Sequence, residues 1–72
     1  MSEKERIELL EEVMDVDPGT LEKDSVLADF EEWDSLTALT LISEMDARFG
    51  KKLSGEEVKG FKTVADVIAV MK

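Results

Sequence analysis

The chain has 72 residues, a length typical of one small domain. It contains no cysteine and no histidine, which excludes disulfides, thiolate and Ser-His nucleophiles, and the usual zinc ligands. Eighteen acidic residues against nine basic ones give a net charge of -9, which argues against nucleic acid as a partner, because phosphate binding needs a basic footprint.

The remaining composition leaves two interpretations of this acidity open. The negative field could speed encounter with basic protein surfaces, or it could only keep a small monomer in solution. The first residues are charged and carry no long apolar stretch, so we expect neither a signal peptide nor a membrane span. A chain without cysteine also fits a reducing compartment, and we predict a cytoplasmic monomer.

The first helix is predicted to begin at Ser2, because Glu5 follows at the spacing of a capping box. An apolar stripe follows at helical spacing, formed by Ile7, Leu9, Leu10, Val13 and Met14. We expect the segment from Asp15 to Gly19 to end this helix. Pro18 disfavours helical geometry in the residue before it, and Gly19 permits a turn.

A long connection leads from there to Asp34, and a structureless loop of that length is uncommon in a compact domain. Four apolar residues are spaced through it, namely Leu21, Val26, Leu27 and Phe30. We expect these side chains to anchor the loop onto the core, with one helical turn.

The second helix is predicted from Asp34 to about Phe49, with Gly50 as its C-cap. One stripe of this helix is the expected core face and contains Ala38, Leu41, Ile42, Met45 and Phe49. The nearly opposite side carries Leu36, Leu39, Thr40, Ser43 and Ala47, where charged residues are usual. That side is either a docking surface for a partner, or Leu36 packs against the preceding loop and Leu39 is an ordinary exposed leucine.

Two further helices are predicted after Gly50. Ser54 and Glu57 have capping-box spacing and open a short third helix, which Gly60 breaks. Thr63 and Asp66 repeat the arrangement before the last helix, whose apolar stripe is Val64, Val67, Ile68 and Met71. The sequence therefore predicts an all-α fold, a small four-helix bundle with three longer helices, one short helix and a long first loop, in a single domain of residues 1–72.

No pattern in the chain predicts catalysis or metal binding. Asp15 and Asp17 match the first ligand positions of an EF-hand, but Thr20 stands where that loop needs glycine and Val26 where it needs glutamate. The many carboxylates could suggest a glycosidase-like pair, yet so short a chain has little room for a substrate cleft. We predict no catalytic residue and no metal site.

Ser35 is ambiguous on pattern alone. Asp34 is the natural N-cap of the second helix, so Ser35 takes the first helical position with its hydroxyl free. A free hydroxyl at the positive end of a helix suits the attachment of an anionic group, although most serines near a helix start have no such role.

The segment "EEWDSLTALTLISEMDARFG", centred on Asp34, Ser35 and Leu36, resembles the signature of the acyl carrier protein family. The resemblance extends over nearly the whole chain, from the first helix and the proline-containing loop to the last helix. It implies that Ser35 carries 4′-phosphopantetheine, transferred from coenzyme A by a phosphopantetheinyl transferase. The thiol of that arm would hold an acyl group as a thioester, so the protein would be a carrier and not an enzyme.

The resemblance also implies a docking surface on the second helix. Asp34 would help to engage the basic transferase, and the partner-docking residues would be Asp34, Leu36, Leu39, Thr40, Ser43 and Glu44. The partners implied are the transferase and acyl-loading and acyl-processing enzymes with basic patches.

The outward side of this helix is poorer in glutamate than is typical of fatty-acid carriers. A dedicated polyketide or specialised lipid pathway is therefore at least as good an interpretation as general fatty acid synthesis. Trp33 before the motif is similar to peptidyl and other specialised carriers. An aminoacyl, D-alanyl or peptidyl carrier and an unmodified acidic interaction module remain alternatives.

Overall fold

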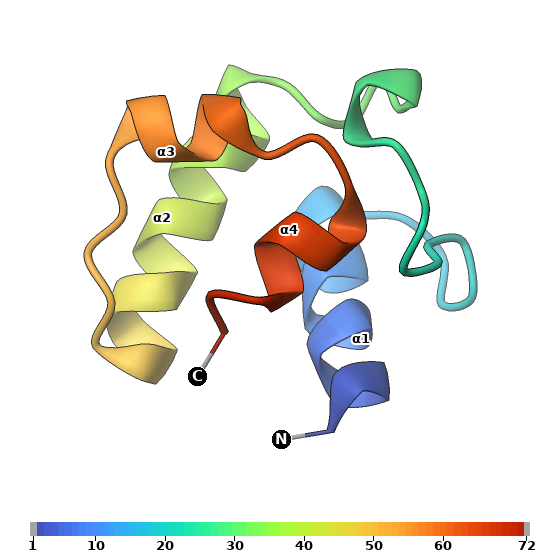
Figure 1. Ribbon diagram of the computed structural model, residues 1–72, viewed down its shortest axis with the longest axis horizontal. Helices are drawn as coiled ribbons and strands as arrows, with labels where there is room; N and C mark the ends of the chain where they lie inside the picture. The colour runs from blue at the N-terminus through green and yellow to red at the C-terminus, as the bar shows by residue number, and fades with distance from the viewer. Residues whose placement is uncertain (1, 72) are drawn as a thin grey trace.

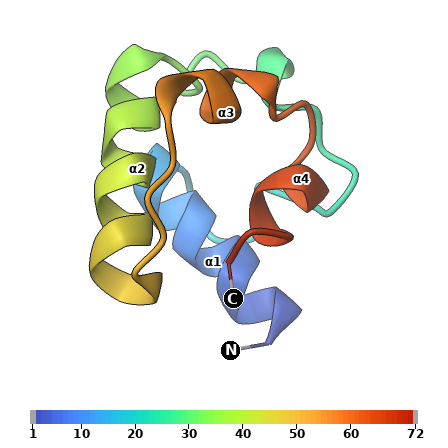
Figure 2. The ribbon, with the colours of Figure 1, turned by 60° about the vertical axis from the view of Figure 1, so that its left-hand side comes forward.

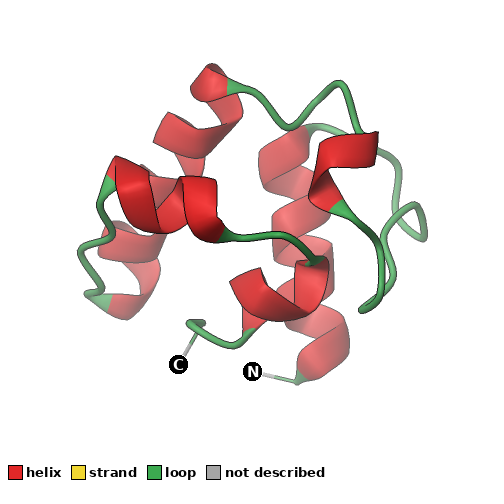
Figure 3. Ribbon diagram, turned by 45° about the horizontal axis from the view of Figure 1, so that its top comes forward, coloured by secondary structure: helices red, strands yellow, loops and turns green. Residues whose placement is uncertain are grey.

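Four α-helices and one 3-10 turn make up the protein in a computed structural model, which describes residues 2–71. Their order is α1 (Glu3–Met14), η1 (Leu27–Asp29), α2 (Ser35–Phe49), α3 (Gly55–Gly60) and α4 (Val64–Ile68). Residues 2–71 contain helices and loops and no named strand (Figure 3). The all-α class with four helices is therefore confirmed.

Helix α1 begins and ends through local hydrogen bonds. The Glu5 N–H donates to the Ser2 hydroxyl and the Ser2 N–H donates to the Glu5 carboxylate, so the predicted capping box is present. The Ser2 backbone N–H thereby lowers the pKa of the Glu5 carboxyl. At the other end, Asp15 adopts a left-handed conformation with φ of 58° and its N–H bonds back into the helix. The helix thus ends before Pro18 can act on it.

The helices surround one apolar core. Figures 1 and 2 both show α4 lying against α1 and α3 lying beside the first half of α2. All the residues predicted for the apolar stripe of the last helix are buried. The buried apolar residues are Leu9, Leu10, Met14, Leu21, Leu27, Leu41, Met45, Val58, Val64, Val67, Ile68 and Met71.

The first loop is anchored as expected, with one exception. Leu21 and Leu27 are buried, Phe30 packs against the core from a half-buried position, and η1 supplies the helical turn. The prediction that Val26 is an anchor is wrong, because Val26 is 43% exposed. Val26 is extended and bridges to Thr63 with its side chain exposed, whereas Leu27 begins η1 and is buried.

The prediction of three longer helices is also wrong, because only α1 and α2 are long. Helix α4 has five residues, although its apolar stripe continues to the buried Met71. Beyond Ile68 the chain tightens, and the N–H groups of Val70 and Met71 bind carbonyls only three residues back. Gly60 closes α3 as its last residue and does not interrupt it earlier.

Candidate functional site

Helix α2 begins with a rigid backbone arrangement at Asp34. Asp34 is extended, and one of its carboxylate oxygens accepts a hydrogen bond of 2.9 Å from the Thr37 N–H. This bond lowers the pKa of the Asp34 carboxyl, so the side chain is ionised at neutral pH. Thr37 is buried, and its hydroxyl donates to the carbonyl of Glu32. Asp34 and Thr37 together fix the direction in which the helix starts.

Ser35 is the first residue of this helix and is exposed. Its hydroxyl makes no hydrogen bond with any of the described residues, because Asp34 already serves as the cap. The free hydroxyl therefore lies at the positive end of a helix of 15 residues, where an attached anion is favoured.

A shallow pocket of about 230 Å³ adjoins Ser35. It is formed where the first half of α2 meets α3, and its lining residues are Trp33, Asp34, Ser35, Ala38, Val58 and Lys59. Trp33 is half-buried and packs against the core, whereas Lys59 is exposed on α3. Sequence patterns did not identify the pocket, because Lys59 comes to Ser35 only through the packing of two helices.

The outward side of α2 carries the two most exposed large apolar residues of the described chain. Leu36 is 73% exposed and Leu39 is 64% exposed. Thr40 and Ser43 are also exposed, and the Thr40 hydroxyl donates to the Leu36 carbonyl. The alternative that Leu36 packs against the preceding loop is therefore wrong, while the docking role of this side stays a prediction.

Glu44 differs from the other docking candidates because it already has a charged partner. Its carboxylate lies 2.6 Å from the Arg48 guanidinium, one helical turn away. This hydrogen bond raises the pKa of Arg48. Glu44 can therefore contribute to an outside contact only in competition with Arg48.

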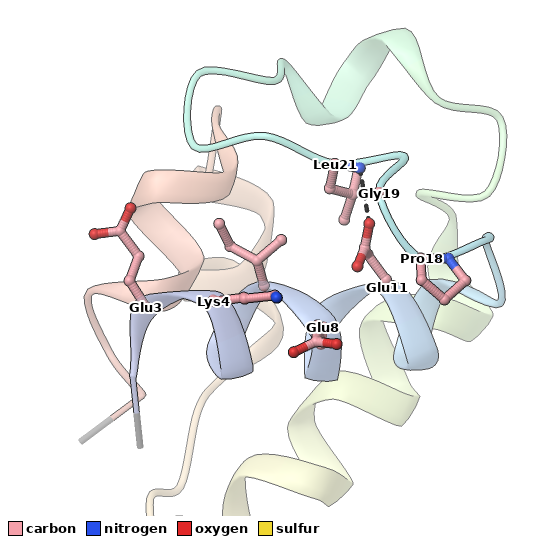
Figure 4. Close-up of a pocket in the computed structure, with 8 residues that line it drawn as sticks. Glu3, Lys4, Glu8, Glu11, Pro18, Gly19 and Leu21 are labelled. Carbon is pink, nitrogen blue, oxygen red and sulfur yellow. Dashed lines mark hydrogen bonds between the residues drawn. The ribbon is translucent and has the colours of Figure 1, made fainter.

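A second, larger pocket lies along α1 and the first loop, away from Ser35. It measures about 460 Å³, and Figure 4 shows Glu11 at its wall with the loop residues Pro18 and Leu21. The Glu11 carboxylate is buried and accepts a hydrogen bond of 3.0 Å from the Leu21 N–H. This bond ties the first loop to α1, a role that the sequence pattern did not indicate.

The described residues hold no group of three potential metal-ligating side chains. In the same part of the chain, the helices are too short and too polar for any of them to cross a bilayer.

An exposed serine with a free hydroxyl at the start of a long helix is accessible for the attachment of an anionic group. The family model described as "Phosphopantetheine attachment site" matches residues 7–71, and the chain belongs to this family of non-catalytic carrier proteins. Carriers of this family are modified by phosphopantetheinyl transferases. The resemblance stated from the sequence, and the cofactor that it implies, are thereby confirmed.

Individual relatives are distant acyl carrier proteins. The chain is 28% identical over 65 residues to a meromycolate extension acyl carrier protein of Mycobacterium tuberculosis, covering 90% of this chain and 56% of that protein. It is 31% identical over 62 residues to an acyl carrier protein of Renibacterium salmoninarum, covering 86% of this chain and 76% of the relative. This chain thus spans little more than half the length of the mycobacterial relative. No solved structure matches the chain.

Proposed function

We propose that Ser35 is the serine to which phosphopantetheine is attached. The observation that carries this proposal is the exposed Ser35 hydroxyl, which has no structural hydrogen bond among the described residues and lies at the positive end of α2. The other exposed serines near helix starts are already occupied. Ser2 and Ser54 each accept a hydrogen bond from the backbone of the helix that they cap.

The attachment is a phosphoryl transfer. The Ser35 oxygen forms a bond to the phosphorus that carries pantetheine in coenzyme A, and the bond from that phosphorus to the diphosphate bridging oxygen breaks. Adenosine 3′,5′-bisphosphate leaves with the bridging oxygen, and the serine proton passes to a base of the transferase. The thiol at the end of the arm then carries the cargo as a thioester, and the protein supplies attachment and delivery.

The cargo proposed is an acyl group. The relatives named above are acyl carrier proteins, which favours an acyl cargo over an aminoacyl or peptidyl one. The uncharged outward residues Thr40, Ser43 and Ala47 make a dedicated polyketide or specialised lipid pathway at least as good a proposal as general fatty acid synthesis. Residues 1–72 would act as one cytoplasmic carrier domain.

The outward side of α2 is the proposed docking surface for the transferase and for acyl-processing enzymes. Leu36 and Leu39 offer apolar contact, and the ionised Asp34 offers charge to a basic patch. Thr40 and Ser43 are exposed farther along the same helix, and their small side chains would let a partner approach closely.

Modification in vitro tests the attachment. The purified protein is incubated with coenzyme A, magnesium and a broad-specificity transferase, and mass spectrometry should find one added phosphopantetheinyl group on Ser35. Ser35→Ala should remove the modification without loss of helical content, because Asp34 still caps the helix and alanine favours helices. Addition to Ser2 or Ser54 would overturn the assignment of Ser35, and failure with several transferases would favour an unmodified interaction module.

A further inference from the structure

The pocket beside Ser35 combines features that suit a phosphodiester. Of the described residues that line it, Lys59 alone carries a positive charge, whereas Asp34 carries a negative one. Figure 2 shows that α3, which carries Lys59, lies next to the start of α2. Lys59 is thus the one basic side chain among the described residues that line the pocket at the N-terminus of α2, in a domain where acidic residues outnumber basic ones two to one.

Lys59 has no acidic partner within 4.0 Å among the described residues. The ion pairs among residues 2–71 join Lys23 to Glu3 and Arg48 to Glu44. The carboxylate of Asp34 is already held by the Thr37 N–H. An ammonium group that lines a pocket and lacks a partner is available to a negatively charged ligand placed there.

We propose that Lys59 is a positioning residue for the prosthetic arm, and that its ammonium pairs with the phosphodiester formed at Ser35. This inference rests on the proposed attachment at Ser35. The new phosphodiester would bring a second negative charge to the residue next to Asp34, and two neighbouring like charges repel each other. Lys59 offsets this repulsion and turns the first part of the arm toward α3 instead of away into solvent.

The dimensions of the pocket limit how much of the arm it holds. A volume of about 230 Å³ lies below the roughly 300–1,000 Å³ of sites that bury a drug-sized ligand. It can therefore receive the phosphodiester and the neighbouring branched carbons, with Trp33, Ala38 and Val58 as apolar walls. The thiol and its cargo would remain outside the pocket, accessible to partner enzymes.

Lys59 has a competing structural explanation that the experiment must separate. It lies in the last turn of α3, where a positive charge interacts favourably with the helix dipole. A purely structural lysine would affect the unmodified and the modified protein equally. A lysine that positions the arm would affect signals from the arm only after modification.

Trp33 makes the test direct, because it is the only tryptophan and the chain has no tyrosine. Wild-type protein, Lys59→Gln and the control Lys52→Gln are modified with coenzyme A and a transferase, and mass spectrometry confirms the added group in each. Trp33 fluorescence is then compared before and after modification, and the ³¹P resonance of the phosphodiester is recorded. Lys52 is an exposed lysine that precedes α3 and does not line the pocket.

Modification should change the Trp33 emission in wild-type protein and in Lys52→Gln, and Lys59→Gln should lose more than half of that change. The ³¹P resonance should move in Lys59→Gln and not in Lys52→Gln. Salt at about 1 M should bring the wild-type signals toward those of Lys59→Gln, because an exposed ion pair is screened. If all three modified proteins give the same signals, the positioning role is overturned while attachment at Ser35 stands; if no group is added, the proposed function fails and this inference with it.

Discussion

Replacing Glu11 by leucine should destabilise the protein, even though the position is buried and leucine is apolar. Glu11 is 3% exposed, and its carboxylate accepts the Leu21 N–H at 3.0 Å. Leucine would leave that backbone N–H without a partner, at a cost of about 1–3 kcal/mol. A single core in a domain of this length rarely supplies more than about 3–5 kcal/mol of net stability, so such a cost would remove much of it.

The melting temperature is the simplest measurement. A domain of this size loses roughly 4–8 °C per kcal/mol, so the Glu11→Leu variant should melt at a clearly lower temperature than wild-type protein. Glu11→Gln keeps an oxygen acceptor of nearly the same shape and should lose much less. Glu12→Leu is the matched control, because Glu12 is the exposed neighbour on the same helix and the helix propensities of the two replaced residues are identical.

Two results would refute this reasoning. Equal melting temperatures for Glu11→Leu and Glu12→Leu would show that the bond to Leu21 contributes nothing to stability. A Glu11→Gln variant as unstable as Glu11→Leu would show that the charge of the carboxylate matters and not its role as an acceptor.

Four other expectations can be tested in similar ways. Leu41→Ala should lower the free energy of unfolding in urea by about 2–5 kcal/mol, because Leu41 is fully buried. Phe49→Ala should cost less than the roughly 3–5 kcal/mol of a fully buried phenylalanine, because Phe49 is half-buried, and a loss within that range would contradict this expectation. Leu39→Ser should alter stability by no more than about 0.5 kcal/mol yet slow modification or acyl loading, and a large loss of stability would place Leu39 in the core. The backbone N–H groups of Lys62 and Thr63 lower the pKa of Asp66 below its ordinary value of 3.8, so the unfolded chain binds the proton first as pH falls. The stabilisation from Asp66 should be complete above that pH and lost below it, and Asp66→Asn should melt below wild-type protein at neutral pH with a difference that shrinks in acid. Association with a basic transferase should slow as salt rises, since the Debye length is about 10 Å at 0.1 M, and a salt-independent rate would leave solubility as the role of the net charge.

Helix boundaries that depend on neighbouring residues could be predicted from the sequence. The capping boxes of Ser2 with Glu5 and of Thr63 with Asp66 need only residues three positions apart, and both are present. Gly50 closes α2 with φ of 64°, a conformation that glycine adopts without steric cost. Such features are local, so the pattern contains the information that determines them.

Features that depend on tertiary packing could not be predicted in this way. The burial of Glu11 requires the first loop to return to α1, and the outward turn of Val26 requires its bridge to Thr63. The predicted end of α1 in the segment from Asp15 to Gly19 is confirmed, but the cause differs. Asp15 ends the helix by adopting a left-handed conformation that few residues other than glycine, asparagine and aspartate accept. The short length of α4 follows from a tightened backbone that leaves the apolar spacing unchanged.

The candidate site shows the same division. The exposure of Leu36 and Leu39 follows from helical periodicity, and the structure places both outward. Periodicity could not reveal the pocket, because Trp33 and Lys59 belong to different elements and meet only when α3 packs on α2. The resemblance to carriers predicts attachment at Ser35, but it gives no indication of what would surround an arm attached there.

The start of α2 separates the residues that maintain the fold from the residue proposed to be modified. Asp34 and Thr37 provide the hydrogen bonds that stabilise the helix terminus, and neither bond involves the Ser35 side chain. A bulky anionic group can therefore be added to Ser35 without removing a stabilising contact, and the helix dipole favours its charge. If the serine had been the cap, modification would have competed with helix formation. Because the cap is the preceding residue, the proposed attachment at Ser35 would leave the hydrogen bonds at the start of α2 intact.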